Sequence, residues 1–481
     1  MSLRYVTDSK VNEASITYYR NRAEGGDSMA VTEPLGTTRW NVAPRRIRVF
    51  EKSNEDGLKR FADVVYTAGC HMIGQLQDSG RGRHEGGRNM KAIGPSALPD
   101  DLSWTIPHAL TTSEVKTMIS DFAESSAWLH KCGWSGIEIS AGHGHIFHQF
   151  MSQHSNKRED DYGGDLEGRT RIVTELMSAI RDLTSSDFIV GVKLPGEDGV
   201  DGGVNFAEAK RISELVAANG NADYVTYCWG SHSDTLYWHL PDLHRERAPF
   251  IGKIGQLAAP FNDTAVGALG LITDPNEGNH AIETGQADLV MMGRPLVTDP
   301  AWGKKAAEGR EAQIRYCVSG NTCWKMIIDG GRLQCDNNPR VGQHDEVDWQ
   351  PPPAKTKRKV VVVGSGIAGM EAAWIAGARG HDVTVFGISG EVGGKTRLHA
   401  ELPGGENLSS IYDFQRLCAD RVGVKMELGL MASADDILAL NPDAVILATG
   451  STMSWPSFLP EEYKDEGFFL DLREIIAALL E

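Results

Sequence analysis

Short apolar runs alternate with longer amphipathic stretches through residues 28–293. The stretch at 112–133, TSEVKTMISDFAESSAWLHKCG, carries an apolar residue about every three to four positions and stops at glycine, which is typical of a surface helix. Apolar runs separated by such helices indicate parallel strands that are buried on both faces. The runs expected to form strands are SMAVTE (28–33), HMIGQL (71–76), GIEIS (136–140), IVGVKL (189–194), ADYVTY (222–227), AVGALGL (265–271) and ADLVMMG (287–293).

This pattern favours a (β/α)8 barrel over an open sheet. A barrel of this size needs an eighth strand to close, and the polar stretch LRYVTDSKVNEAS near the start of the chain is a poor candidate. We therefore predict an α/β fold whose first part, residues 1–314, is a TIM barrel lacking a clear first strand. The chain looks as if it begins after that strand.

Length, charge and cysteine content exclude several classes of protein. A chain of 481 residues is too long for one ordinary core, so we expect two domains. A net charge of −17 repels phosphate backbones, which argues against a nucleic-acid partner. We find neither an apolar run of the roughly 18 residues that cross a membrane nor a signal pattern after Met1. The cysteines are scattered and odd in number, which fits a reducing compartment. We therefore expect a cytoplasmic protein without a membrane partner.

A proline-rich and then lysine-rich stretch marks the clearest domain boundary. PPP at 351–353 is followed by the basic run KTKRK. We interpret this run as a solvated linker rather than a nucleic-acid patch. The predicted order is thus a cysteine segment at 315–340, a linker at 341–358 and a second domain at 359–481.

The second domain opens with a glycine-rich fingerprint, KVVVVGSGIAGMEAAWIAGARGHDVTVFG (359–387), which reads as strand, turn, helix and strand. Gly364 would make the tight turn, Gly366 would let a pyrophosphate approach, and Gly369 would let the helix pack on the strand. The acidic residue that should bond a ribose hydroxyl is replaced by Gly387. No second fingerprint follows. We predict a Rossmann-like, incomplete domain, with ADP or FAD as its candidate ligand.

Several motifs together resemble one family. In chain order they are GQLQDSGRG (74–82), GPSALP (94–99), NKREDDYGGDLEGRTR (156–171), ADLVMMGRPLVTDP (287–300) and a cysteine-rich segment. This order resembles the long form of the Old Yellow Enzyme-like FMN oxidoreductases, which includes trimethylamine dehydrogenase, 2,4-dienoyl-CoA reductase, and the dimethylglycine and N-methylproline demethylases. The resemblance covers nearly the whole chain.

The resemblance implies an FMN-binding barrel, a [4Fe–4S] segment, an ADP- or FAD-binding domain and a nicotinamide-type domain. The resemblance also implies that MSLRYV lies downstream of the usual first strand and that the chain ends where the third domain would begin. Some FMN contacts should therefore be absent.

The same resemblance assigns cofactor contacts at the carboxyl ends of the strands, where barrel enzymes place their reacting groups. Gln75 would bond the pyrimidine edge of the flavin, and Lys193 would stabilise the negative charge of the reduced flavin near N1 and O2. Gly270, Gly293 and Arg294 would hold the FMN phosphate in the loops after the last two strands.

The segment EISAGHGHIFHQF (138–150) bears on the reaction. By the resemblance, Ser140 and His143 stand where ene-reductases hold a carbonyl group, and His145 stands where they have a proton-donating tyrosine. His143 also matches a histidine of the amine dehydrogenases. A neutral histidine can accept a proton or orient a substrate. Amine oxidation needs no proton donor to carbon, so the loss of the tyrosine favours it.

Aromatic residues follow the strand expected at 222–227. In VTYCWGSHSDTLYWHLPD, Tyr227 and Trp229 are candidates for binding a methylated ammonium group through cation–π attraction, worth about 0.5–2 kcal/mol each. The alternative is that these rings only pack against the barrel rim.

Three cysteines fall within RYCVSGNTCWKMIIDGGRLQC (315–335). By the resemblance, Cys317, Cys323 and Cys335 match the first, third and fourth ligands of the cluster, and Gly320 replaces the second. An iron–sulfur cluster, zinc on three thiolates and no metal at all are the alternatives.

The leading hypothesis is an FMN-dependent demethylase that acts on a small N-methylated amine or amino acid, releases formaldehyde and passes electrons to a carrier such as an electron-transfer flavoprotein. The first rival is an NAD(P)H-dependent ene-reductase of the enoate or 2,4-dienoyl-CoA type. The second is a degenerate remnant without catalytic activity. A homo-oligomer is left open.

Overall fold

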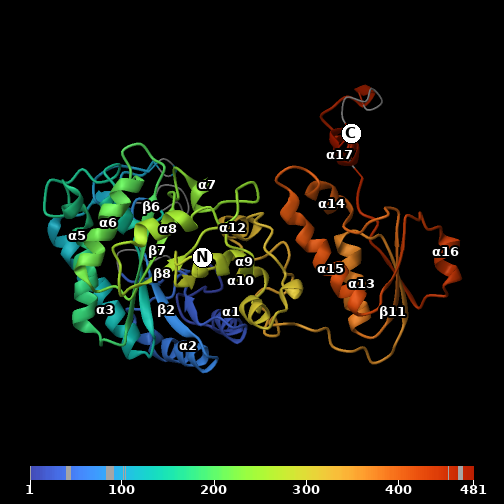
Figure 1. Ribbon diagram of the computed structural model, residues 1–481, viewed down its shortest axis with the longest axis horizontal. Helices are drawn as coiled ribbons and strands as arrows, with labels where there is room; N and C mark the ends of the chain where they lie inside the picture. The colour runs from blue at the N-terminus through green and yellow to red at the C-terminus, as the bar shows by residue number, and fades with distance from the viewer. Residues whose placement is uncertain are drawn as a thin grey trace. The chain divides into compact units, whose positions relative to one another are not determined.

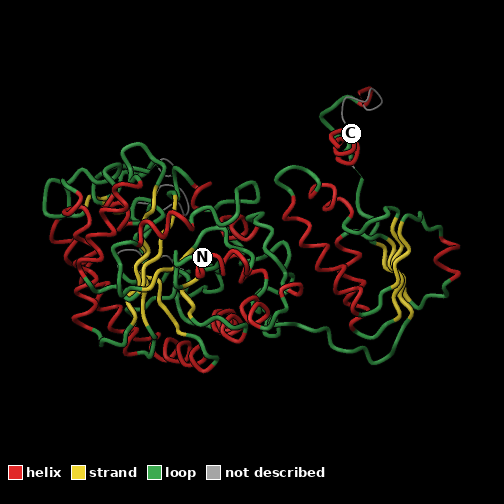
Figure 2. The backbone as a smooth tube through the Cα atoms, in the orientation of Figure 1, coloured by secondary structure: helices red, strands yellow, loops and turns green. Residues whose placement is uncertain are grey.

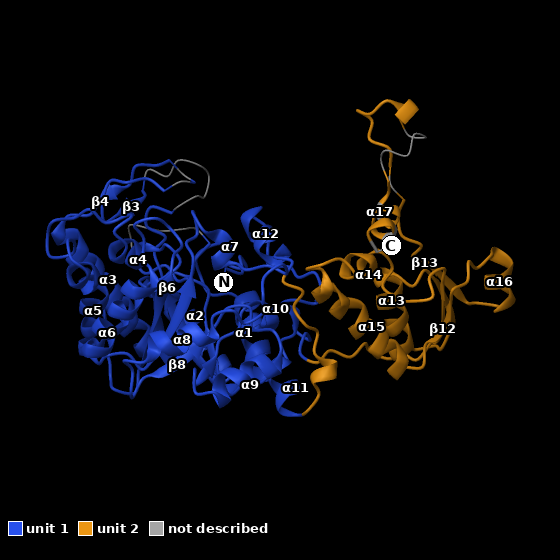
Figure 3. Cartoon of the chain, turned by 45° about the horizontal axis from the view of Figure 1, so that its top comes forward, with its two compact units in different colours: residues 1–308, 320–347 blue, residues 309–319, 348–481 orange. Residues whose placement is uncertain are grey.

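The computed structural model describes residues 2–38, 45–82, 91–100, 102, 104–452, 454–463 and 470–480. The chain forms two compact units (Figure 3): Met1–Glu308 with Gly320–Val347, and Gly309–Ser319 with Asp348–Glu481. Residues 309–319 therefore group with the second unit, although the sequence analysis divided them between the barrel and the cysteine segment.

The first unit is built on a seven-stranded parallel sheet in the order β1-β2-β5-β6-β7-β8-β9. Each strand pairs in parallel with the next one in this order, as the strands of a TIM barrel do. Within the described ranges β1 and β9 are the two edges. The predicted barrel lacking a clear first strand is thus confirmed. The strands are β1 (Met29–Val31), β2 (His71–Leu76), β5 (Gly136–Ser140), β6 (Ile189–Glu197), β7 (Tyr224–Trp229), β8 (Ala265–Ala268) and β9 (Leu289–Val290).

Helices lie outside this sheet, and Figure 1 shows α3, α5 and α6 together on one side of the strands. The helices are α1 (Glu13–Glu24), α2 (Glu55–Thr67), α3 (Thr112–Lys131), α4 (Ile146–Met151), α5 (Leu166–Leu183), α6 (Phe206–Asn219), α7 (Leu236–His239), α8 (Ile251–Ala258), α9 (Pro275–Glu283), α10 (Arg294–Thr298), α11 (Trp302–Ala307) and α12 (Thr322–Ile328). A 3-10 turn, η1 (Lys52–Asn54), precedes α2, and a small sheet joins β3 (Ile93–Gly94) to β4 (His108–Ala109).

Helix α3 shows how the sequence determines where a helix begins and which of its faces is buried. Thr111 accepts a hydrogen bond from the backbone N–H of Glu114, whose side chain bonds back to the amide of Thr111, so a capping box starts the helix. Its apolar residues recur at helical spacing and are buried at Val115, Met118, Phe122 and Leu129. The 112–133 stretch therefore forms the predicted surface helix.

The second unit contains a four-stranded parallel sheet in the order β12-β11-β10-β13, with α13 and α15 beside one face (Figure 2). Its elements are η2 (Glu311–Gln313), β10 (Lys359–Val363), α13 (Ile367–Ala378), β11 (Asp382–Gly387), α14 (Gly394–Ala400), η3 (Glu406–Leu408), α15 (Ser409–Arg421), β12 (Lys425–Leu428), α16 (Ala434–Ala439), β13 (Ala444–Leu447), η4 (Glu461–Tyr463) and α17 (Leu472–Leu480). The strand–helix–strand order with crossovers confirms the Rossmann-like fold. No helix of the described part of the chain is both long and apolar enough to span a membrane.

A buried ion pair attaches the stretch after the cysteine segment to α1. The Arg22 guanidinium donates to both carboxylate oxygens of Glu346, at 2.9 and 3.0 Å, and the two side chains are 3% and 0% exposed. Glu346 also accepts hydrogen bonds from Asn21, Asn338 and the amide of Gly342. Every oxygen of this buried carboxylate is therefore satisfied.

Glu346→Gln should lower the free energy of unfolding of the first unit by about 3–5 kcal/mol, because Arg22 would keep a buried charge without a counter-charge. Urea unfolding followed by circular dichroism measures this loss. Asp329→Asn is the matched control, since the Lys325–Asp329 pair is exposed and should contribute less than about 1 kcal/mol. Equal losses in the two variants would contradict the account.

Candidate functional site

Four polar side chains from four neighbouring strands meet inside the barrel. Glu138 on β5 lies in register with Gln75 on β2. Glu138 Oε1 accepts hydrogen bonds from Gln75 Nε2 at 2.9 Å and Lys193 Nζ at 2.8 Å, and Oε2 accepts one from the Tyr224 hydroxyl at 3.1 Å. Because Glu138 is completely buried, it forms with Lys193 an ion pair that water screens little.

Tyr224 reaches Glu138 across a glycine. Gly191 on β6 stands between them in register, and a Cβ at residue 191 would lie 2.1 Å from Tyr224 Cζ. Burial, together with the Glu138 carboxylate, raises the pKa of Tyr224 well above its usual value. The Tyr224 hydroxyl therefore remains a neutral hydrogen-bond donor.

The next layer of the barrel consists of Ser140, Lys193 and Thr226, which are in register on β5, β6 and β7. Side chains two residues apart on a strand point to the same side, so Ser140 and Thr226 face inward as Glu138 and Tyr224 do. The Thr226 hydroxyl is buried, and no described residue pairs with it. A cation beside an unsatisfied hydroxyl fits the polar pyrimidine edge of a flavin, so the residues present fit FMN at this point.

A histidine cluster lies near the end of β5, and we define it as His143, His145, His232 and His239 with Trp324. The rings of His143 and His239 stack with centroids 3.8 Å apart and planes 4° apart. His232 lies 5.8 Å from His239 and 6.5 Å from His145, and the Trp324 ring of α12 lies 5.4 Å from His232. Segments after β5, after β7 and in α12 thus build one aromatic surface.

Three imidazoles of this cluster, those of His143, His145 and His239, are held neutral. Burial, and then the neighbouring histidines, lower the pKa of His143, His145 and His239 well below the ordinary value. Gln77 Nε2 lies 2.6 Å from His145 Nε2, so the amide N–H donates and the proton of His145 is on Nδ1. The Nδ1 atom of His239 is buried and finds no partner in the described ranges. The cluster can therefore both accept and donate hydrogen bonds.

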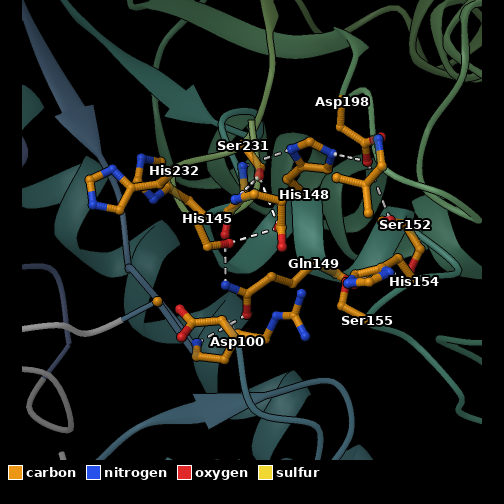
Figure 4. Close-up of a pocket in the computed structure, with 16 residues that line it drawn as sticks. Asp100, His145, His148, Gln149, Ser152, His154, Ser155, Asp198, Ser231 and His232 are labelled. Atoms are coloured by element: carbon orange, nitrogen blue, oxygen red, sulfur yellow. Dashed lines mark hydrogen bonds and ion pairs between the residues drawn. The ribbon is translucent and has the colours of Figure 1, made fainter. Parts of the chain in front are cut away.

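A polar cavity of about 30 Å³ adjoins His145, with room for one or two water molecules (Figure 4). His148 Nδ1 accepts from the Gly144 amide at 2.8 Å, so its Nε2–H donates to Asp198 Oδ2 at 3.3 Å. Water held between His145 and Ser231 would connect the cluster to further polar groups. The remaining lining side chains include Arg81, Asp100, Gln149, Ser152, His154, Ser155 and Asp234.

The two aromatic residues chosen as substrate contacts lie elsewhere. The Tyr227 hydroxyl bonds Ser213 of α6 at 2.8 Å and the Leu257 carbonyl of α8 at 2.9 Å. Trp229 stacks on Phe250 with ring centroids 4.0 Å apart. Alternation along β7 turns these rings toward the helices, because Tyr224 and Thr226 face inward. The structure brings Trp324, rather than Tyr227 or Trp229, to the histidines.

The predicted phosphate-binding residues follow β8 and β9. Gly270 has a φ of +112°, and a Cβ there would lie 2.6 Å from the Phe250 ring, so glycine is required. Gly293 precedes α10 and faces open space. Arg294 donates to Asn321 Oδ1 at 2.6 Å and to a carbonyl after α7 at 2.7 Å. Phosphate binding by these residues stays a prediction.

Of the three cysteines predicted to bind a cluster, Cys323 and Cys335 belong to the first unit and Cys317 belongs to the second. Among the residues that the structure describes, no group of three or more His, Cys, Asp or Glu side chains is placed to hold a metal ion. Cys335 Sγ instead lies 3.4 Å from Thr298 Oγ1. An iron–sulfur cluster on Cys317, Cys323 and Cys335 therefore stays a prediction.

The glycine-rich turn of the second unit has the predicted geometry. Gly364 has a φ of +115°, and a Cβ there would lie 2.1 Å from a backbone oxygen just beyond β13. A Cβ on Gly369 would lie 1.9 Å from the Gly364 oxygen, and Gly366 caps α13. At Gly387 a Cβ would lie 2.3 Å from the serine hydroxyl of the same turn. A side chain at this position would therefore require Ser365 and Leu428 to shift.

Sequence analysis missed Glu138 and Tyr224, as well as the cluster members His232, His239 and Trp324. A charged residue inside the buried run GIEIS was a usable signal, because a buried charge needs a partner. The cluster members offered no such signal, since segments far apart in the sequence bring them together.

Both parts of the chain match models of known protein families. The model of the NADH:flavin oxidoreductase / NADH oxidase family matches residues 2–313, and that of the NAD(P)-binding Rossmann-like domain matches residues 362–411. The NADH oxidase of Thermoanaerobacter brockii is 31% identical over 98% of this chain and 72% of its own length. The probable N-methylproline demethylase of Rhizobium meliloti (strain 1021) is 32% identical over 93% of this chain and 66% of its own length.

A solved structure supports the same relationship. A complex of 2-naphthoyl-CoA reductase with 2-naphthoyl-CoA superposes with a TM-score of 0.91 and is 26% identical, covering 100% of this chain and 75% of the reductase chain. The chain thus spans between about two thirds and three quarters of the length of these relatives.

The neutral cluster should make stability depend on pH. His143, His145 and His239 have lowered pKa values when folded, so below about pH 6.5 the unfolded chain binds more protons than the folded chain. The free energy of unfolding should then fall by up to roughly 1.4 kcal/mol per pH unit for each group. Thermal unfolding from about pH 8 to about pH 5 measures the slope. His239→Phe should make the slope of stability against pH shallower. An unchanged slope would contradict the lowered pKa of His239.

Proposed function

Because the chain belongs to the NADH:flavin oxidoreductase / NADH oxidase family, we propose that it oxidises a small N-methylated amine or amino acid by hydride transfer to FMN. Membership in this family confirms the resemblance found in the sequence and makes the chain an FMN-type oxidoreductase with an NAD(P)-binding Rossmann-like domain. Substrate, electron carrier and residue roles are the proposal.

FMN would supply the hydride acceptor. Gln75 and Lys193 would hold the pyrimidine edge of its ring, because both project inward from neighbouring parts of the sheet and converge on Glu138. The unsatisfied Thr226 hydroxyl supports a polar ligand at the same place. Gly270, Gly293 and Arg294 would contact the phosphate, as the sequence analysis expects.

The histidine cluster carries the substrate proposal. The neutral imidazole of His143 can orient an amine and take the proton of its ammonium form, and His145 can orient the substrate by donating a hydrogen bond from Nδ1. The unpartnered Nδ1 of His239 adds a further proton site. The face of Trp324 offers cation–π attraction for a methylated ammonium. Loss of a hydride from the N-methyl carbon leaves an iminium, which water converts to the demethylated amine and formaldehyde.

The observation that carries the amine reading is His145 itself. The Nε2 atom of His145 accepts a hydrogen bond from Gln77. Because its pKa is lowered, the ring is not protonated and has no extra proton to give to a substrate carbon. Reduction of a carbon–carbon double bond needs a proton delivered to carbon, whereas amine oxidation does not. The similarity to a probable N-methylproline demethylase supports the same choice.

An NAD(P)H-dependent ene-reductase is the second candidate. It is favoured by the NAD(P)-binding domain and by the similarity to a 2-naphthoyl-CoA reductase, which superposes over the whole chain. In that reading the electrons enter from the nicotinamide and leave to an enoyl substrate.

Anaerobic spectroscopy separates the two candidates. Mixing the FMN-loaded chain with dimethylglycine or N-methylproline should bleach the flavin absorbance and release formaldehyde. Bleaching by NADPH, followed by reoxidation with an enone and no response to either amine, would favour the reductase.

His145→Tyr is the matched variant for this experiment. Restoring a phenol at residue 145 should speed enone reoxidation by roughly 10²-fold, the contribution of a positioned acid, and slow bleaching by the amine. An enone rate unchanged in this variant would contradict the role given to His145.

A further inference from the structure

The buried carboxylate of Glu138 takes no part in the proposed reaction, yet it contacts both residues expected to hold the flavin ring. The same oxygen, Oε1, accepts from Gln75 Nε2 at 2.9 Å and from Lys193 Nζ at 2.8 Å. Glu138 is therefore placed to control which atom Gln75 presents and how much positive charge Lys193 presents.

We propose that Glu138 is a positioning residue that fixes the amide of Gln75, partly neutralises Lys193, and so lowers the reduction potential of bound FMN. The inference rests on flavin binding by the barrel and is independent of whether the substrate is an amine or an enone.

The orientation of the Gln75 amide follows from donor and acceptor chemistry. A carboxylate only accepts hydrogen bonds, so the amide nitrogen of Gln75 must face Glu138. Its Oε1 is then left for a ligand above it. Gln75 consequently offers Oε1 as an acceptor for a ring N–H of the flavin, and the second N–H of its amide is left for a ring carbonyl.

The charge on Lys193 is offset by its nearest neighbour. The Lys193 side chain is 14% exposed and that of Glu138 is 0% exposed, so the pair lies where charges interact strongly. An isolated cation at this position would favour the negatively charged reduced flavin. With Glu138 beside it, that preference is smaller, and reduced FMN returns its electrons more readily.

The carboxylate is held in place from its other side. Oε2 accepts from the Tyr224 hydroxyl at 3.1 Å, across the space that Gly191 leaves. With partners on both oxygens, Glu138 cannot turn away from Gln75 and Lys193 without losing hydrogen bonds in a buried site.

Glu138→Gln tests the proposal through the midpoint potential of the bound flavin, measured by anaerobic titration against a reference dye. The variant removes the negative charge but keeps the shape, so the potential should rise, by about 30 mV for each tenfold gain in relative affinity for reduced FMN. Glu138→Asp keeps the charge but moves it away from Lys193, so a smaller rise of the midpoint potential is expected. If Glu138→Gln does not retain FMN, the potential of Glu138→Asp tests the proposal.

Glu346→Gln is the control, because it removes the charge of another buried, ion-paired glutamate of the same unit. It should lower stability and leave the potential unchanged. An unchanged or lowered potential in the Glu138 variants, or an equal rise in Glu346→Gln, would overturn the proposal.

Discussion

The buried ion pair between Glu138 and Lys193 is the interaction on which the interior of the barrel depends. A charge inside a parallel sheet is tolerated only where partners satisfy it, and here three neighbouring strands contribute donors to one carboxylate. The register of those strands, the glycine at residue 191 and the orientation of Gln75 together meet that requirement. The pair thus links strand packing to the expected cofactor site.

A second constraint is the alternation of side chains along each strand. On β7 it directs Tyr224 and Thr226 into the barrel and Tyr227 and Trp229 toward the helices. Only the inward set can contact a ligand at the barrel mouth. The outer set stabilises the layer of helices that keeps the strands in register.

Much of the fold could be predicted because periodicity is local. The runs at 71–76 and 136–140 form β2 and β5 with the same bounds, and the glycine-rich turn has the geometry its spacing requires. The candidate site was only partly predictable. Trp324 joins the histidines through a contact between segments far apart in the chain, which no local pattern encodes.

Two further expectations show the limits of residue type as a guide. Aromatic character suggested Tyr227 as a substrate contact, but position on the strand, not residue type, decides which way a ring points. Cysteine spacing suggested a cluster, which stays a prediction, because whether thiolates converge depends on how separate segments pack. In both cases the sequence supplied suitable atoms without fixing their directions.

Titration of the purified chain with FMN, followed by quenching of flavin fluorescence, tests the central claim most directly. The account predicts one FMN per chain with a dissociation constant of roughly micromolar or tighter, weakened at least about tenfold when Lys193→Gln removes the cation that the inward-facing layer provides. No saturable binding, or equal binding by Lys193→Gln, would contradict it.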